Sequence, residues 1–379
     1  MIKILHCADA HLDAPFALSG VSGSELRRRE LRESFRQMMR FVRDKQVDIL
    51  LIAGDLFDGR NVKRETVEMV REEFAKSRGT RIFISPGNHD PYTDGSVWQT
   101  TEFSSNVVVF RDTALSHVAV RDLGVEVYGY AFQDTYLPYN PAATFHLSHP
   151  EYLNILCAHG DLTSPASRYC PITKQDIERS GLDYIALGHI HNGTQMEQLG
   201  KTRFAYSGCL EGRSFDECGY KSALLIEAEK SPDGEVQLHS QRVRFSQRRY
   251  ERDTVDITGV ESAEEICARI ARTVQMKDYG EDTALRLILT GTVSPELTIS
   301  PTELAAGEYG LFYLEVESRA LPLYDERTLH EDRGIRGAFY GALAPLLQGS
   351  DADREMGLLA LHYGLSALAG EDLKAGFQE

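Results

Sequence analysis

The feature that most constrains the fold is an alternation of short apolar runs with helical patterns across roughly the first 240 residues. Helices are predicted over Ser24–Lys45 and Arg64–Arg78, the first because its apolar residues recur at helical spacing. Strands that alternate with helices imply a sheet whose neighbouring strands are connected by crossover helices, so the sequence predicts an α/β layered domain. The predicted strands are Ile2–His6, Asp48–Ala53, Arg81–Ser85, Val107–Phe110, Val125–Tyr130, Leu153–Ala158 and Tyr184–Leu187.

The pattern changes near residue 242, and we therefore predict three parts: a domain over 1–245, a small α+β domain over 250–322 and a helical tail over 325–379. Ser262, with Glu265 three residues later, predicts the start of a helix in the second part. An arginine-rich stretch precedes it and is interpreted either as a contact for phosphate groups or as a solvated linker. Its members are Arg242, Arg244, Arg248, Arg249 and Arg252.

Polar residues follow the predicted strands of the first domain, at the point where each strand ends. Ligands of open α/β sheets bind outside the carboxyl ends of the strands, so these loops are expected to meet at one crevice. Each segment alone has an ordinary explanation as a turn. Together they supply carboxylates, an amide oxygen and imidazoles, which suit manganese, iron or zinc better than calcium. The segments are Asp9-Ala10-His11, Gly54-Asp55, Gly87-Asn88-His89-Asp90, His159-Gly160-Asp161 and Gly188-His189-Ile190-His191.

This series of segments resembles the signature of the calcineurin-like metallophosphoesterase superfamily, whose fold is a layered β-sandwich flanked by helices. The order of a phosphoesterase domain, a small cap domain and a helical tail is similar to the SbcD-type DNA repair exonucleases. The opening segment, His6 to Phe16, looks most like the YhaO-type branch of that group.

The resemblance implies two divalent metal ions, with manganese as the expected metal. One ion would be bound by Asp9, His11, Asp55 and His191. The other would be bound by Asp55, Asn88, His159 and His189. Asp55 would bridge them, since the two oxygens of a carboxylate can hold two cations about 3.5–4 Å apart. Such a pair neutralises a phosphodiester and lowers the pKa of a bridging water.

Four further positions near these ligands are interpreted separately. The resemblance gives His89 a catalytic role, assisting the leaving oxygen or orienting the phosphate. Asp58 stands where some relatives have a histidine, and it is left out of the catalytic set. Asp90 and Asp161 are candidates for holding the imidazole ligands in place. A further segment, Tyr206-Ser207-Gly208, is interpreted either as part of the cleft or as an edge turn.

Charge and cysteine content limit the functional class. The chain has 379 residues and a net charge of −16, which disfavours coating nucleic acid by bulk charge but not one local contact. No apolar run is long enough for a membrane span, and the six cysteines form no Cys-x-x-Cys pair, so a reducing cytoplasm is expected.

The resemblance implies a DNA substrate, an SbcC-like ATPase partner and a homodimer, and hence a two-metal DNA phosphodiesterase of a repair complex. Two alternatives stay open from the residues themselves. One is a phosphatase or small-molecule phosphodiesterase on the same fold, since function resides in the site rather than the fold. The other is a scaffold that positions DNA for an ATPase. The tail helices are interpreted either as a docking surface or as packing on the cap domain.

Overall fold

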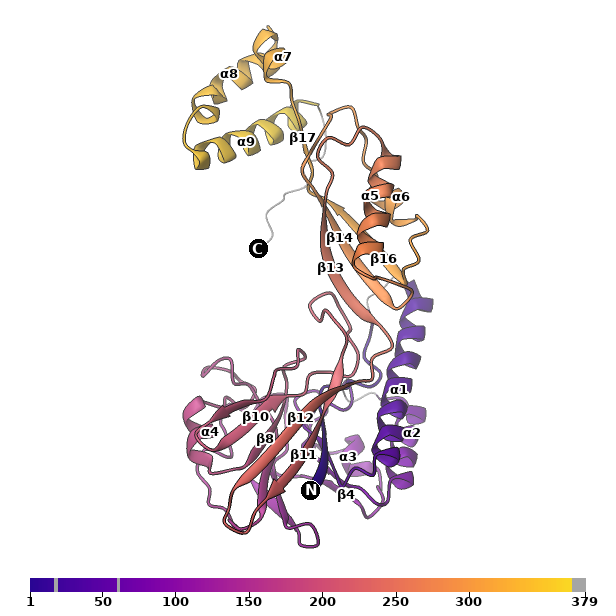
Figure 1. Ribbon diagram of the computed structural model, residues 1–379, viewed down its shortest axis with the longest axis vertical. Helices are drawn as coiled ribbons and strands as arrows, with labels where there is room; N and C mark the ends of the chain where they lie inside the picture. The colour runs from indigo at the N-terminus through magenta and orange to yellow at the C-terminus, as the bar shows by residue number, and fades with distance from the viewer. Residues whose placement is uncertain (17–19, 60–61, 370–379) are drawn as a thin grey trace. The chain divides into compact units, whose positions relative to one another are not determined.

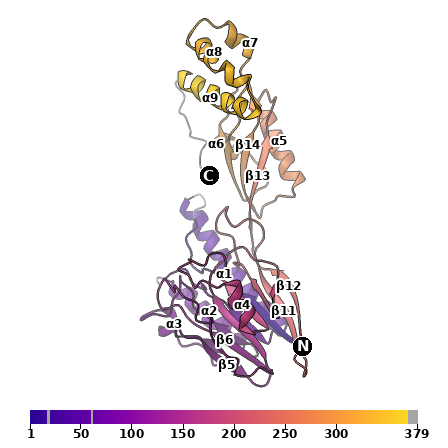
Figure 2. The same ribbon diagram turned by 90° about the vertical axis from the view of Figure 1, so that its left-hand side faces the viewer.

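The computed structural model describes residues 1–16, 20–59 and 62–369. The chain forms two compact units, Met1–Tyr250 and Glu251–Glu379. Each unit has its own apolar core, and Figures 1 and 2 show the secondary structure of both.

The first unit contains a six-stranded sheet whose central strands are parallel. Its order is β12-β11-β1-β2-β3-β4, with β1, β2, β3 and β4 parallel and the β11–β12 hairpin antiparallel at one edge. The strands are β1 (Ile2–Cys7), β2 (Ile49–Ile52), β3 (Arg81–Ile84), β4 (Val107–Val109), β11 (Ser222–Lys230) and β12 (Val236–Arg244).

A second six-stranded sheet has the order β5-β6-β7-β8-β10-β9, and its strands β6, β7, β8 and β10 are parallel. The strands are β5 (Ser116–Val120), β6 (Val125–Gly129), β7 (Leu153–His159), β8 (Tyr184–Gly188), β9 (Glu197–Leu199) and β10 (Thr202–Tyr206).

The two sheets pack face to face because alternate residues of each strand point to opposite sides. In β2, Ile49 and Leu51 belong to the core shared with Ile155 of the second sheet. Leu50 and Ile52 instead face the core that the helices cover. The helices of this unit are α1 (Gly20–Asp44), α2 (Arg64–Lys76), α3 (Val97–Thr100) and α4 (Lys174–Ser180).

Helices α1 and α2 cover the outer face of the first sheet through Leu31, Phe35, Met38, Val70 and Phe74, all fully buried (Figure 1). The outer face of the second sheet packs against α4 and neighbouring loops in a third core. The result is a β-sandwich flanked by helices, which confirms the predicted fold class.

The second unit is built on a three-stranded sheet of order β13-β14-β16. Helix α5 packs on one face of this sheet through Ile266, Ile270 and Val274 (Figures 1 and 2). The Ser262 hydroxyl accepts a hydrogen bond from the Glu265 amide at 3.3 Å and begins α5 as predicted. The elements are β13 (Arg249–Asp256), α5 (Ala263–Met276), β14 (Thr283–Thr290), β15 (Thr292–Val293), α6 (Pro301–Ala305), β16 (Tyr313–Ser318), β17 (Leu321–Pro322), α7 (Glu326–Glu331), α8 (Ile335–Leu347) and α9 (Asp351–Ala369).

The arginine-rich stretch lies mostly on strands, so it is not an irregular linker. Arg242 and Arg244 end β12, and Arg249 and Arg252 lie on β13. Arg248, between the two strands, forms an ion pair with Glu30 of α1 at 2.6 Å. Arg248 is therefore held against the sandwich of the first unit by a specific ion pair.

Candidate metal centre

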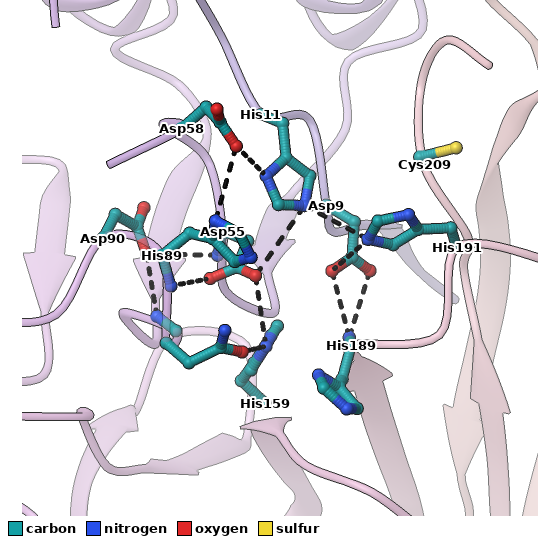
Figure 3. A network of polar contacts seen from close by, with 12 residues as sticks. Asp9, His11, Asp55, Asp58, His89, Asp90, His159, His189, His191 and Cys209 are labelled. Atoms are coloured by element: carbon teal, nitrogen blue, oxygen red, sulfur yellow. Dashed lines mark hydrogen bonds and ion pairs between the residues drawn. The ribbon is translucent and has the colours of Figure 1, made fainter. Parts of the chain in front are cut away.

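The predicted ligands come from the carboxyl ends of strands in both sheets of the sandwich. Asp9 and His11 follow β1, Asp55 follows β2 and Asn88 follows β3 of the first sheet. The second sheet supplies His159 at the end of β7, and His189 and His191 after β8. Figure 3 shows that the labelled side chains of this set gather in one place.

Three of these residues, Asp9, His11 and His191, form one group whose ligand atoms all lie within 4.8 Å of one another. The Nε2 atoms of His11 and His191 are 3.1 Å apart, and His191 Nε2 lies 3.9 Å from an oxygen of Asp9. All three side chains point toward the same space (Figure 3).

A second group is formed by Asp9, Asp55 and His159. His159 Nε2 lies 2.8 Å from Asn88 Oδ1 and 3.4 Å from Asp55 Oδ2. The same Asp55 oxygen lies 3.7 Å from His11 Nε2. Asp55 is therefore placed between the two groups, where a bridging carboxylate would have to lie.

The hydrogen bonds of the imidazoles show that these groups fit cations. His11 Nδ1 donates to Asp58 Oδ1 at 2.9 Å, and His191 Nδ1 donates to Glu217 Oε1 at 2.6 Å. Because a carboxylate only accepts, each Nδ1 carries a proton, and the two Nε2 atoms face each other across 3.1 Å.

The same reasoning applies to His159, whose Nδ1 lies 3.0 Å from the Ala53 carbonyl oxygen. Its Nε2 is then an acceptor that faces the oxygens of Asn88 and Asp55. Converging acceptors repel one another unless a cation or proton lies between them. Carboxylate, amide and neutral imidazole donors are also the set that first-row divalent metals accept.

His189 is placed differently from the other predicted ligands. Its backbone amide donates to both oxygens of Asp9 at 3.1 Å, which orients that carboxylate. Its ring packs edge-on against the ring of His159, with centroids 5.3 Å apart, and lies 5.0 Å from the ring of Tyr169. Among the described residues, His189 is in none of the groups whose ligand atoms lie within 4.8 Å.

The backbone at the site adopts conformations that non-glycine residues rarely occupy. Positive φ angles occur at Asp9 (49°), His11 (45°), Asp55 (51°) and His189 (102°). Such conformations persist only where surrounding contacts enforce them, and they are concentrated at functional sites. Gly54 has φ +90°, and a Cβ there would lie 2.2 Å from the Nδ1 atom of His159, so this turn requires glycine.

The carboxylates that hold the imidazoles differ from those expected. They are Asp58 on His11 and Glu217 on His191. Asp90 instead accepts backbone amides, among them that of Asp55 at 3.2 Å, and so braces the loops. Asp161 accepts from the amide of Thr163. The expectation that Asp90 and Asp161 hold imidazoles is therefore wrong, because Asp90 accepts backbone amides from the loops after β2 and β3 and Asp161 accepts from its own turn.

Arg213 connects the two supporting carboxylates. Its guanidinium lies 3.5 Å from Asp58 Oδ1 and 3.5 Å from Glu217 Oε1, and Glu217 also accepts the Arg213 backbone amide at 2.7 Å. No sequence pattern pointed to Glu217 or Arg213, which lie more than twenty residues beyond His191 and outside any recognised segment.

The ionisation of these groups follows from burial and from the hydrogen bonds. Burial lowers the pKa of His11, in spite of its bond to Asp58. For Glu217, burial is outweighed by the bond from His191, and the pKa falls to about 2. Burial also opposes ionisation of Asp55, but the neighbouring imidazoles, His159 first, lower its pKa. Burial and the adjacent Asp55 charge raise the pKa of Asp90 well above its usual range.

His89 lies beside the ligands but faces outward. Its side chain is 47% exposed, whereas those of His11 and His159 are fully buried. Its Nδ1 lies 3.4 Å from Asp58 Oδ1, and that hydrogen bond raises the pKa of His89 against the opposing effect of burial. His89 is thus a protonatable, partly exposed group beside the ligands.

Comparison with known proteins identifies the family. The model of the calcineurin-like phosphoesterase family matches residues 2–193. The chain belongs to this family. It is 29% identical over 313 residues to the uncharacterized metallophosphoesterase YhaO of Bacillus subtilis (strain 168), covering 79% of this chain and 74% of that protein.

A more distant relative is the DNA double-strand break repair protein Mre11 of Methanopyrus kandleri. It is 26% identical over 309 residues, covering 74% of this chain and 65% of that protein. These two relatives support the SbcD-type resemblance. A solved dimetal phosphatase from Danio rerio matches 65% of this chain and 99% of its own, at 11% identity and a TM-score of 0.39.

Family membership makes the chain a metallophosphoesterase, a class of hydrolase that uses divalent metals. The groups at Asp9, His11, Asp55, His159 and His191 are the candidate positions for them. The six cysteines are free thiols. None of the helices over residues 1–16, 20–59 and 62–369 has both the length and the apolar character that crossing a membrane requires.

Proposed function

We propose that this metallophosphoesterase hydrolyses phosphodiester bonds of DNA, as the nuclease subunit of a repair complex. The observation that carries the proposal is the pair of acceptor groups that face each other across Asp55. The printed name of the Mre11 relative, a double-strand break repair protein, supports DNA as the substrate.

The proposed ligand set is the one expected from the resemblance, with two manganese ions. Asp9, His11, Asp55 and His191 would hold one ion, and Asp55, Asn88, His159 and His189 the other. For His189 this requires a ring nitrogen to join the ligand atoms of Asp55, Asn88 and His159, whereas the ring now packs against those of His159 and Tyr169. When bound, such a metal pair neutralises the phosphodiester charge and acidifies an attacking water.

The protein itself supplies orientation and a proton. Asp58 and Glu217 fix the rings of His11 and His191 through Nδ1, so their Nε2 atoms are aimed at the site. Asp58 also holds the Nδ1 side of His89, which leaves the Nε2 atom to face the substrate. We assign His89 as the catalytic residue that donates a proton to the leaving oxygen.

The remainder of the chain is proposed to serve assembly, with residues 250–322 as a cap and 325–379 as the docking segment for an SbcC-like ATPase in a homodimeric complex. Helices α7, α8 and α9 share a small apolar core around Leu329, Tyr340 and Leu361. Large apolar side chains nevertheless stay exposed, such as Ile335 (68%) and Met356 (63%). Exposed apolar side chains of this kind are typical of partner surfaces.

A nuclease assay on defined single- and double-stranded DNA, across several divalent metals, tests the proposed activity. We expect manganese-dependent cleavage by the wild type and its loss in Asp55→Asn, with circular dichroism showing that the variant is folded. Rapid hydrolysis of a nucleotide or phosphoprotein with DNA left intact would instead make the chain a phosphatase or small-molecule phosphodiesterase.

The assembly part is tested separately by pull-down of an SbcC-like ATPase. Capture by the intact chain but not by a chain ending near Asp325 is expected. Equal capture by both would place the docking surface elsewhere.

A further inference from the structure

A polar cavity of about 150 Å³ lies in the first unit, next to the candidate metal centre. His191 and Asn192 line it on one side, and Lys221 and Arg242 line it on the other. The remaining lining residues are Gly193, Ser207, Gly208, Cys209, Cys218, Tyr220 and Ser222, so no carboxylate faces it.

Lys221 is buried without a charged partner among the described residues. It is only 5% exposed, and its ammonium group donates to Asn192 Oδ1 at 2.7 Å and to the Cys218 carbonyl at 3.0 Å. Both acceptors are uncharged. A buried lysine is nearly always paired, because burial of an ion without a counter-charge is costly.

Arg242 brings a second cation to the same cavity. Its guanidinium donates to the carbonyl oxygens of Ser207 at 2.8 Å and Tyr206 at 3.0 Å, to that of Thr194, and to Ser222 Oγ at 3.1 Å. These acceptors are again uncharged, and burial lowers the pKa of Arg242. Each bond orients the guanidinium, but none neutralises it.

The local backbone is shaped to admit this arginine. A Cβ at Gly193 would lie 2.4 Å from a terminal nitrogen of Arg242, so a side chain there would displace the guanidinium from its present position. At the rim of the cavity, Tyr220 carries the guanidinium of Arg244 over its ring at 3.3 Å and that of Arg249 at 4.9 Å. Two further guanidinium groups thus lie against Tyr220, one of the residues that line the cavity.

We propose that this cavity is a binding pocket for a phosphate group, held by Lys221 and Arg242. A phosphate would supply the negative charge that the buried Lys221 and the half-buried Arg242 lack, accepting the third N–H of the Lys221 ammonium and lying beside the positive charge of the Arg242 guanidinium. The shared wall at His191 puts the pocket beside the proposed cleavage site. If the proposed function holds, the natural occupant is a phosphate of the DNA strand near the scissile bond, and a free phosphate is the other source.

The first test uses the full chain freed of metal with a chelator, and inorganic phosphate as the probe. We expect calorimetric titration to show binding by the wild type, and an at least tenfold weaker dissociation constant in Lys221→Gln and Arg242→Gln. Arg203→Gln is the matched control. Arg203 lies on the neighbouring strand β10, outside the cavity, and donates to the Val236 carbonyl.

Arg242→Lys keeps the charge and should recover much of the binding, which a purely structural role of the guanidinium would not predict. Thermal unfolding in the absence of phosphate checks that each variant is folded. Equal phosphate binding by the wild type and both Gln variants would overturn the pocket, as would the same loss in Arg203→Gln.

The second test distinguishes the two sources with a single-stranded oligonucleotide under the same metal-free conditions. Weaker binding of both probes by Lys221→Gln supports a pocket for a phosphate of the strand. Weaker binding of inorganic phosphate alone supports a free-phosphate site. Neither arm needs catalysis, so a chain that binds phosphate here but cleaves no DNA would refute the proposed function and leave the pocket standing.

Discussion

Replacing Glu217 by glutamine should weaken the binding of one of the two metal ions and leave the binding of the other unchanged. Glu217 Oε1 accepts from His191 Nδ1 at 2.6 Å, and its other oxygen accepts the Arg213 amide at 2.7 Å. Glutamine keeps the shape and an acceptor oxygen but removes the charge, so the hydrogen bond to His191 Nδ1 is no longer charge-assisted, and the ring is held less firmly and becomes a less basic ligand.

The size of the effect follows from comparable supporting residues, whose loss weakens metal binding by about 10- to 100-fold. This corresponds to about 1.4–2.8 kcal/mol of binding free energy. His159 is supported by the Ala53 carbonyl and not by Glu217. The effect should therefore fall on the ion held by Asp9, His11 and His191.

Manganese titration of the metal-free protein by calorimetry measures this directly. The wild type should bind two ions, and Glu217→Gln should retain one binding step unchanged while the other weakens. Asp161→Asn is a matched control, because Asp161 is also a buried carboxylate near the site but accepts from Thr163. Equal weakening of both steps, or the same loss in Asp161→Asn, would refute the reasoning.

Three other changes have defined outcomes. Gly54→Ala puts a methyl group 2.2 Å from a ring atom of His159 and should lower the free energy of unfolding by about 1–3 kcal/mol, measured by urea denaturation. Arg27→Ala leaves the buried carboxylate of Glu211 without its 2.8 Å partner and should cost about 3–5 kcal/mol in the same assay, whereas a loss below 1 kcal/mol would show that the pair contributes little. Burial raises the pKa of Glu30, but the hydrogen bonds from Arg248 and Arg27 outweigh it and lower the pKa below the ordinary value of 4.5. The ionised carboxylate therefore stabilises the folded protein above pH 4.5, and this stabilisation is lost as the pH falls through the lowered pKa. The stability difference between the wild type and Glu30→Gln should thus be largest near neutral pH and shrink in acid, and a difference that does not vary with pH would contradict this assignment.

The sequence predicts several strands that are buried on both faces, although not β11, whose residues 223–226 are buried. Ile49–Ile52 of β2 is fully buried, and its continuous apolar run is a strong signal. Strand β12 was missed because it is an edge strand whose residues, such as Gln237 and Ser240, are mostly polar and partly exposed. Its pairing with β11 depends on contacts distant from any local pattern.

At the site, too, some parts could be predicted from the sequence and others could not. The segments that follow the strands meet as expected, because parallel strands bring their carboxyl ends to one edge. The supporting groups could not be predicted, since Glu217 reaches His191 from a loop that only the folded chain brings close. Asp58 was set aside for lacking the chemistry of a phosphate contact, yet the structure places it on His11 and near His89.

The origin of the ligands in both sheets has a mechanical consequence. Asp9, His11 and Asp55 belong to one layer of the sandwich, and His159 and His191 belong to the other. An ion bound by ligands from both sheets would hold the two layers together at the end where these loops lie. Its removal should then quicken amide exchange in the turns after β2 and β8 first, while the middle of each strand stays protected.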